Sequence, residues 1–91
     1  MAVTVRIPSV LRNLTAGKET IDVAAGTVND ALDAVERMHP GIKARLCDDA
    51  GKLRRFVNVF VGEEDIRFLD GQVTTIKDGE LVDIVPAIAG G

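Results

Sequence analysis

The spacing of the apolar residues changes twice along this chain of 91 residues, and this restricts the fold more than any other feature. Apolar and polar residues alternate over residues 3–7 and 18–24, which predicts two half-buried strands. Over residues 28–38 the apolar residues recur every three or four positions, which predicts an amphipathic helix. Two more apolar segments of strand type follow, over residues 56–61 and 81–86.

Local signals mark both ends of the predicted helix. Thr27 is a suitable N-cap, and Asp30 stands three residues later, close to a capping box. The sequence His-Pro-Gly at residues 39–41 ends the helix, because proline cannot continue it and glycine tolerates the left-handed conformation of a helix end. We expect one more helical turn over residues 42–46 and a loop over residues 47–52.

Shorter segments complete the pattern. Leu11 and Leu14 belong to a predicted loop between the first two strands. Residues 62–65 are predicted to form a turn, residues 66–68 a short strand, and residues 70–71 another turn.

This order of elements predicts an α+β fold of the β-grasp, ubiquitin-like type. Neither a sheet nor an amphipathic helix buries its apolar side alone, so one main helix must cover one face of a mixed sheet of four to five strands. The β-grasp arrangement requires the first strand, residues 3–7, to pair in parallel with the last, residues 81–86. We predict a domain over residues 1–86 and a flexible, extended C-terminal tail over residues 87–91.

Composition excludes several classes of function. The net charge of −3 supplies no basic face for a phosphate backbone, so we expect no nucleic-acid partner. The apolar runs are too short to span a bilayer, and the N-terminus lacks the layout of a signal peptide. We therefore expect no membrane partner and a cytoplasmic location.

Residues suited to catalysis or metal binding are few. One histidine and one cysteine cannot supply the three or four ligands of a zinc site, and no phosphate-binding glycine loop occurs. His39 is predicted to lie beside the last carbonyls of the helix. Two aspartates follow Cys47 and favour its protonated thiol. We expect no catalytic residue, no metal and no bound cofactor.

The last six residues, Pro86 to Gly91, have no charged side chain, are small apart from Ile88, and end in two glycines. Six extended residues reach roughly 20 Å, and glycine lets a backbone approach a tunnel wall closely. Such a tail can place its terminal carboxylate in the active site of another protein. A frayed terminus is the alternative interpretation.

Four segments resemble the ThiS/MoaD family of sulfur carriers, which are relatives of ubiquitin. They are VTVRIP at residues 3–8, GKLRRFVNV at 51–59, EDIRF at 64–68 and IVPAIAGG at 84–91. The resemblance extends nearly end to end, and the last segment is the most specific. Within the family, the chain is most similar to carriers of a cysteine-synthesis route.

The resemblance implies that Gly91 is adenylated by an E1-like enzyme of the MoeB/ThiF type and converted to a thiocarboxylate. Ala87, Ile88, Ala89 and Gly90 would then thread into the active sites of partners. The implied partners are that adenylyltransferase, a PLP-dependent cysteine synthase or other sulfur-accepting synthase, and a zinc-dependent JAMM-type peptidase. ATP, PLP and zinc would belong to those partners and not to this chain.

Three alternatives stay open at this point. The chain could donate sulfur to molybdopterin, thiamin or a sulfur-containing natural product. It could be a ubiquitin-like modifier joined through Gly91 to lysines, or a binding module that uses only its sheet face. Beyond the tail, Pro86 is a candidate for partner contact, and Arg54 and Arg55 would suit an acidic partner.

Overall fold

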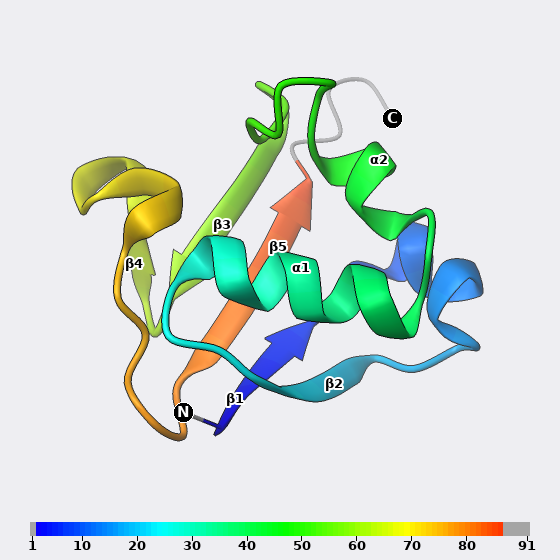
Figure 1. Ribbon diagram of the computed structural model, residues 1–91, viewed down its shortest axis with the longest axis horizontal. Helices are drawn as coiled ribbons and strands as arrows, with labels where there is room; N and C mark the ends of the chain where they lie inside the picture. The colour runs from blue at the N-terminus through cyan, green and yellow to red at the C-terminus, as the bar shows by residue number, and fades with distance from the viewer. Residues whose placement is uncertain (1, 87–91) are drawn as a thin grey trace.

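The computed structural model describes residues 2–86, which form one sheet with helices on one face (Figure 1). The strands are β1 (Ala2–Arg6), β2 (Thr20–Ala24), β3 (Val57–Val61), β4 (Glu64–Asp65) and β5 (Leu81–Pro86). The α-helices are α1 (Val28–Met38) and α2 (Ile42–Leu46), and the 3-10 helices are η1 (Ser9–Thr15), η2 (Ile66–Phe68) and η3 (Gly71–Val73). The predictions for Ala87, Ile88, Ala89, Gly90 and Gly91 fall outside the described residues.

The sheet has five strands in the order β2-β1-β5-β3-β4 (Figure 1). The first and last strands are parallel neighbours, with Val5 of β1 opposite Val82 of β5. The other three pairings are antiparallel. The predicted parallel pairing is therefore confirmed, and β5 runs through the middle of the sheet.

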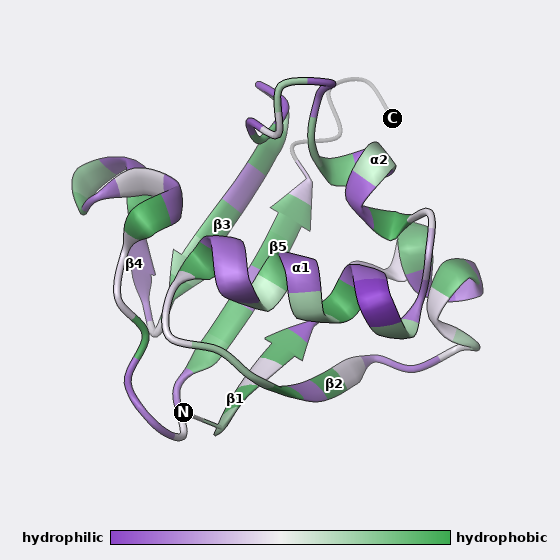
Figure 2. Ribbon diagram, viewed as in Figure 1, coloured by the Kyte–Doolittle hydropathy of each residue, from purple (hydrophilic) through white to green (hydrophobic). Residues whose placement is uncertain are grey.

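The core lies between the sheet and α1, and it follows the two periods seen in the sequence. Val3 and Val5 of β1 are buried, and the residues of β1 between and beside them are exposed or half-buried. In Figure 2, α1 shows hydrophilic bands toward the viewer while the strands behind it are largely hydrophobic. The buried residues are aliphatic or small, and all three phenylalanines lie outside this core, with Phe56 53% exposed and Phe68 85% exposed.

Side-chain caps define the two α-helices. The Thr27 hydroxyl accepts a hydrogen bond from the backbone N–H of Asp30 at 3.2 Å, as predicted. The Asp30 carboxylate reaches back to the N–H of Gly26 at 3.4 Å, one residue before the N-cap. The Glu36 carboxylate accepts from the N–H groups of Gly41 and Lys43 and so caps the start of α2. These bonds satisfy donors that a helix N-terminus leaves free.

Two predicted segments differ from the structure. Residues 66–68 were expected to form a strand, but they form η2, and the strand is the preceding pair Glu64–Asp65, which was expected to be part of a turn. The Asp65 side chain accepts a hydrogen bond from the N–H of Arg67 at 2.9 Å, which closes a tight turn in place of the sheet ladder.

The connection between β1 and β2 is more ordered than a loop. It contains η1, and Leu11 and Leu14 pack against the core as partly buried residues. The buried Thr15 hydroxyl bonds to the carbonyl of Lys18 at 2.9 Å and so closes the connection.

Candidate functional site

The end of β5 fixes the point from which the C-terminal segment starts. Pro86 lies opposite Val57, the first residue of β3, and Val85 lies opposite Asn58. Val57 is buried at 4% exposure, whereas Val85 is 39% exposed. The base of the tail is thus held by β3 and β5, which pack into the core on one face and are exposed on the other.

Proline at this position does not interrupt the sheet. The Glu80 carbonyl accepts a hydrogen bond from Thr4 N–H at 3.1 Å, so alternate residues of β5, including Pro86, direct their backbone groups toward the β1 side. The β1 ladder already ends where Arg6 faces Asp83. The missing N–H of Pro86 therefore removes no ladder bond.

The face of the sheet opposite α1 is only partly polar. Arg6 and Asp83 form an ion pair across β1 and β5 at 3.5 Å, and the Thr4 hydroxyl donates to Asp22 at 2.9 Å. Toward the end of β5 the exposed side chain of Val85 stands on this face opposite Asn58. An apolar side chain therefore borders the base of the tail on this open face.

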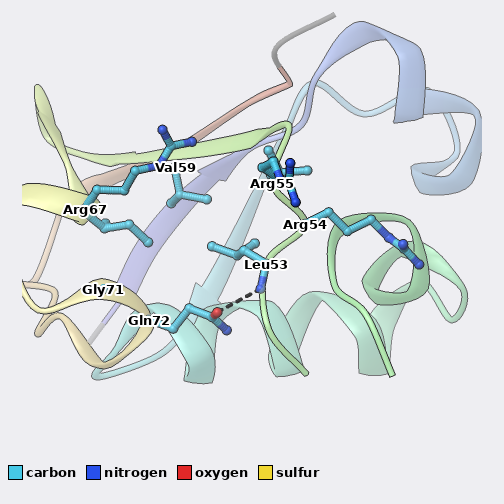
Figure 3. Close-up of a pocket in the computed structure, with 9 residues that line it drawn as sticks. Leu53, Arg54, Arg55, Val59, Arg67, Gly71 and Gln72 are labelled. Atoms are coloured by element: carbon cyan, nitrogen blue, oxygen red, sulfur yellow. Dashed lines mark hydrogen bonds between the residues drawn. The ribbon is translucent and has the colours of Figure 1, made fainter. Parts of the chain in front are cut away.

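The segment before β3 is anchored by Gln72 of η3 (Figure 3). Its side-chain oxygen accepts from Leu53 N–H at 2.8 Å, and its side-chain nitrogen donates to the Gly51 carbonyl at 2.9 Å and to Asn29 Oδ1 at 2.8 Å. The Arg54 N–H also donates to the Leu46 carbonyl at 2.9 Å. These bonds hold residues 51–54 against α1, α2 and η3.

Arg54 and Arg55 point to different neighbours although they are adjacent in sequence. The Arg54 guanidinium donates to the Ala44 carbonyl at 3.1 Å and extends toward α2, away from the centre of the view in Figure 3. Both residues are exposed. One of the two arginines therefore supports α2, and the predicted contact of Pro86, Arg54 and Arg55 with a partner stays a prediction.

A groove lies at the side of β3, between the segment before β3 and the η2–η3 segment (Figure 3). It has a volume of about 380 Å³, and Leu53, Val57, Val59 and Ile66 line it together with Arg55 and Arg67. The Arg67 side chain donates to Asn58 Oδ1 and so spans the edge of β3. Sequence reasoning missed Arg67, because the spacing of residues 64–68 gives no sign that η2 turns this side chain back onto β3.

Cys47 and His39 have structural positions. Burial raises the pKa of the Cys47 thiol, and nearby Asp48 adds to this while Lys43 opposes it, so the thiol is protonated at neutral pH. His39 is the C-cap of α1, at the predicted end of the helix, but among the described residues its buried Nε2 has no hydrogen-bond partner. No group of three or more His, Cys, Asp or Glu side chains within the described part of the chain could hold a metal ion. No helix among residues 2–86 has the length and apolar character to cross a membrane.

Comparison with known proteins identifies the family. The model described as the ThiS family matches residues 5–91. The chain belongs to the ThiS family. Sulfur carrier protein CysO of Mycobacterium tuberculosis is 44% identical over 93 residues, covering 100% of both chains. Small archaeal modifier protein 3 of Haloferax volcanii is 37% identical over 65 residues, covering 71% of this chain and 70% of the other.

Solved structures support the same assignment for this ThiS-family chain. A chain in the crystal structure of the Amycolatopsis orientalis BexX/CysO complex is 48% identical, with a TM-score of 0.92, and the match covers 99% of this chain and 100% of that one. The predicted β-grasp fold is therefore confirmed. The relative named sulfur carrier protein CysO is similar to this chain over its whole length.

Proposed function

We propose that this ThiS-family chain is a sulfur carrier for a biosynthetic pathway, with cysteine biosynthesis as the first candidate. The observation that carries the proposal is its full-length 44% identity with a relative named sulfur carrier protein CysO. The carried group is a thiocarboxylate on the last residue, Gly91. The chain acts in the cytoplasm as a protein co-substrate and not as the catalyst.

The proposed chemistry takes place at the terminal carboxylate. A carboxylate oxygen attacks the α-phosphorus of ATP, which forms an acyl adenylate and releases pyrophosphate. A sulfur nucleophile then attacks the acyl carbon, and AMP leaves with the bonding pair, so that sulfur replaces one oxygen. Cys47 is not that sulfur nucleophile, because its thiol is buried and protonated.

Three partner enzymes follow from this chemistry. An E1-like adenylyltransferase of the MoeB/ThiF type would activate Gly91, a PLP-dependent cysteine synthase or another synthase would accept the sulfur, and a JAMM-type zinc peptidase would release the product. The existence of a BexX/CysO complex supports the idea that carriers of this kind dock on other proteins. In each case residues 87–91 would enter the partner's active site, and Pro86 and Arg55 would lie at its mouth.

A second candidate function is that of a ubiquitin-like modifier. It is favoured by the 37% identity with small archaeal modifier protein 3. A modifier forms isopeptide bonds between Gly91 and lysines of other proteins, whereas a carrier ends as a thiocarboxylate or a small-molecule adduct. The two functions therefore leave different groups on the same residue.

Intact-mass spectrometry tests the proposal directly. The full chain is incubated with the E1-like enzyme from the same organism, ATP and a sulfide source, and the expected result is the mass gain of sulfur replacing one oxygen. A chain lacking Gly91 is the control, and its circular dichroism shows whether the fold is kept. No mass gain with any native E1-like enzyme rules out the carrier function, and high-mass lysine adducts in cells point to the modifier.

A further inference from the structure

The groove beside β3 combines an apolar floor with positive charge in a chain whose net charge is −3. Leu53 is half-buried and is the most exposed apolar residue of the lining, whereas Val57, Val59 and Ile66 also line the groove but are almost completely buried. Three arginines also line the groove, and none of the described residues that line it carries a carboxylate. The groove is therefore positively charged although the chain as a whole is negatively charged. A positive patch of this kind is expected at a contact with an acidic partner.

The polar groups of the groove are unequally free to bind a ligand. Gln72 uses its side-chain oxygen and nitrogen on Leu53, Gly51 and Asn29. Arg54 is bonded to α2 through the Ala44 carbonyl. Arg67, from η2, donates to Asn58 Oδ1 and keeps its other guanidinium N–H groups, and Arg55 stands at the opposite side, on the segment before β3 (Figure 3).

This division restricts the occupant. A small polar ligand would find no free hydrogen-bonding group on the apolar floor, and burying its polar atoms there would be unfavourable. An apolar side chain fits the floor, while carboxylates on the same segment would meet the guanidinium groups at its sides. Two such charges, without an aromatic side chain among the described residues of the lining to stack on bases, do not suit a nucleic acid.

The groove also adjoins the base of the tail. Val57 lines the groove and lies opposite Pro86, so a protein that receives the C-terminal segment comes close to both. A contact there adds to the affinity for the partner without entering its active site.

We propose that this groove binds an acidic segment of the partner protein, in which one apolar side chain stands between carboxylates. The apolar side chain packs against Leu53, and the carboxylates pair with Arg55 and with the guanidinium N–H groups that Arg67 does not use on Asn58. The inference rests on the proposed function, because that function supplies a partner at the tail.

The test uses a short synthetic peptide, blocked at both ends, in which one leucine is flanked by glutamates. Adding it to the full chain should shift the backbone NMR signals of the groove residues, with weaker binding as salt rises. Arg67→Glu and Arg55→Glu should each weaken binding about fivefold or more, whereas Arg37→Glu on α1 should leave it unchanged. Arg37 is an exposed arginine outside the groove.

Two further peptides separate the two parts of the contact. Replacing the glutamates by glutamines should abolish the salt dependence, and replacing the leucine by serine should abolish the shift at Leu53. No shift at the groove with millimolar peptide, or equal shifts with the glutamine peptide, would overturn the proposal. Shifts of the same residues when the chain alone is concentrated would also overturn it, because a second copy would then be the occupant.

The peptide experiment is independent of sulfur transfer. It uses the unmodified chain and no enzyme, so its failure leaves the thiocarboxylate assay intact. Conversely, a chain that accepts no sulfur can still bind the peptide. The two hypotheses therefore fail on different measurements.

Discussion

Pro86 lies opposite Val57 at the end of the β3–β5 ladder, so the base of the C-terminal segment rests on a residue that also lines the groove. Val57 is almost completely buried, while Val85, the residue before Pro86 on β5, is 39% exposed on the other face. The strand pair that supports the tail therefore packs into the core on one face, and its other face is available for contact.

This arrangement predicts different effects for two chemically identical substitutions. Val57→Ala removes buried methyl groups and should lower the free energy of unfolding by about 1–3 kcal/mol. Val85→Ala should lower it by no more than about 0.5 kcal/mol, because its side chain is partly solvated in the folded state. Urea denaturation followed by circular dichroism measures both values. Equal losses would show that the two sides of this strand pair are not energetically distinct.

We predict that replacing Gln72 loosens the segment before β3 locally. A measurement of overall stability alone would miss this effect. Gln72→Met removes the acceptor for Leu53 and the donor to Gly51, and should cost about 1–3 kcal/mol. Hydrogen exchange of the Leu53 amide should accelerate more than exchange in α1. Gln72→Glu keeps an oxygen for Leu53 and should restore part of its protection. If Leu53 exchanges no faster in Gln72→Met, this side chain does not anchor the segment.

We predict that the Asp65 side chain fixes the position of Arg67. Asp65→Ala removes the acceptor for Arg67 N–H and should destabilise the chain by about 1 kcal/mol, while Asp65→Asn keeps an acceptor and should have a smaller effect. The sharper measurement is the exchange rate of the Arg67 amide, which should rise in the alanine variant alone. An unchanged rate there would mean that η2 is held by other contacts.

We predict that the Cys47 thiol makes the stability of the folded chain depend on pH in the alkaline range. Burial raises the pKa of the folded thiol above that of an unfolded thiol, which is about 8.5. Between these two pKa values the unfolded chain releases a proton that the folded chain keeps, so stability is lost as the pH rises above about 8.5. Cys47→Ala should flatten that loss, with a slope change of up to about 1.4 kcal/mol per pH unit. Urea titrations between pH 7 and pH 10 measure the slope, and identical slopes would contradict the buried thiol as its cause.

Much of the fold follows from local patterns in the sequence. The alternation of Val3 and Val5 and the helical spacing after Thr27 gave strands and a helix where the structure has them. The parallel pairing of β1 with β5 depended on the β-grasp arrangement, because element order alone does not determine which strands become neighbours. The positions of these elements were predictable because each buries a periodic apolar face.

The groove was not predictable, and the reason lies in single side-chain bonds. Asp65 turns the chain into η2, which brings Arg67 back over Asn58, and Gln72 draws the segment before β3 against α1. None of these three bonds has a periodic signature in the sequence. The adjacent Arg54 and Arg55 looked equivalent for the same reason, although Arg54 is held by the Ala44 carbonyl.

The central place of β5 has a mechanical consequence. A partner that pulls on the C-terminus applies force along a strand that is bonded to β1 on one side and to β3 on the other. The hydrogen bonds of both ladders are then loaded together in shear, and they do not open one at a time as they would in an edge strand that is peeled away. The β-grasp domain can therefore bear tension at its C-terminus while its core stays closed.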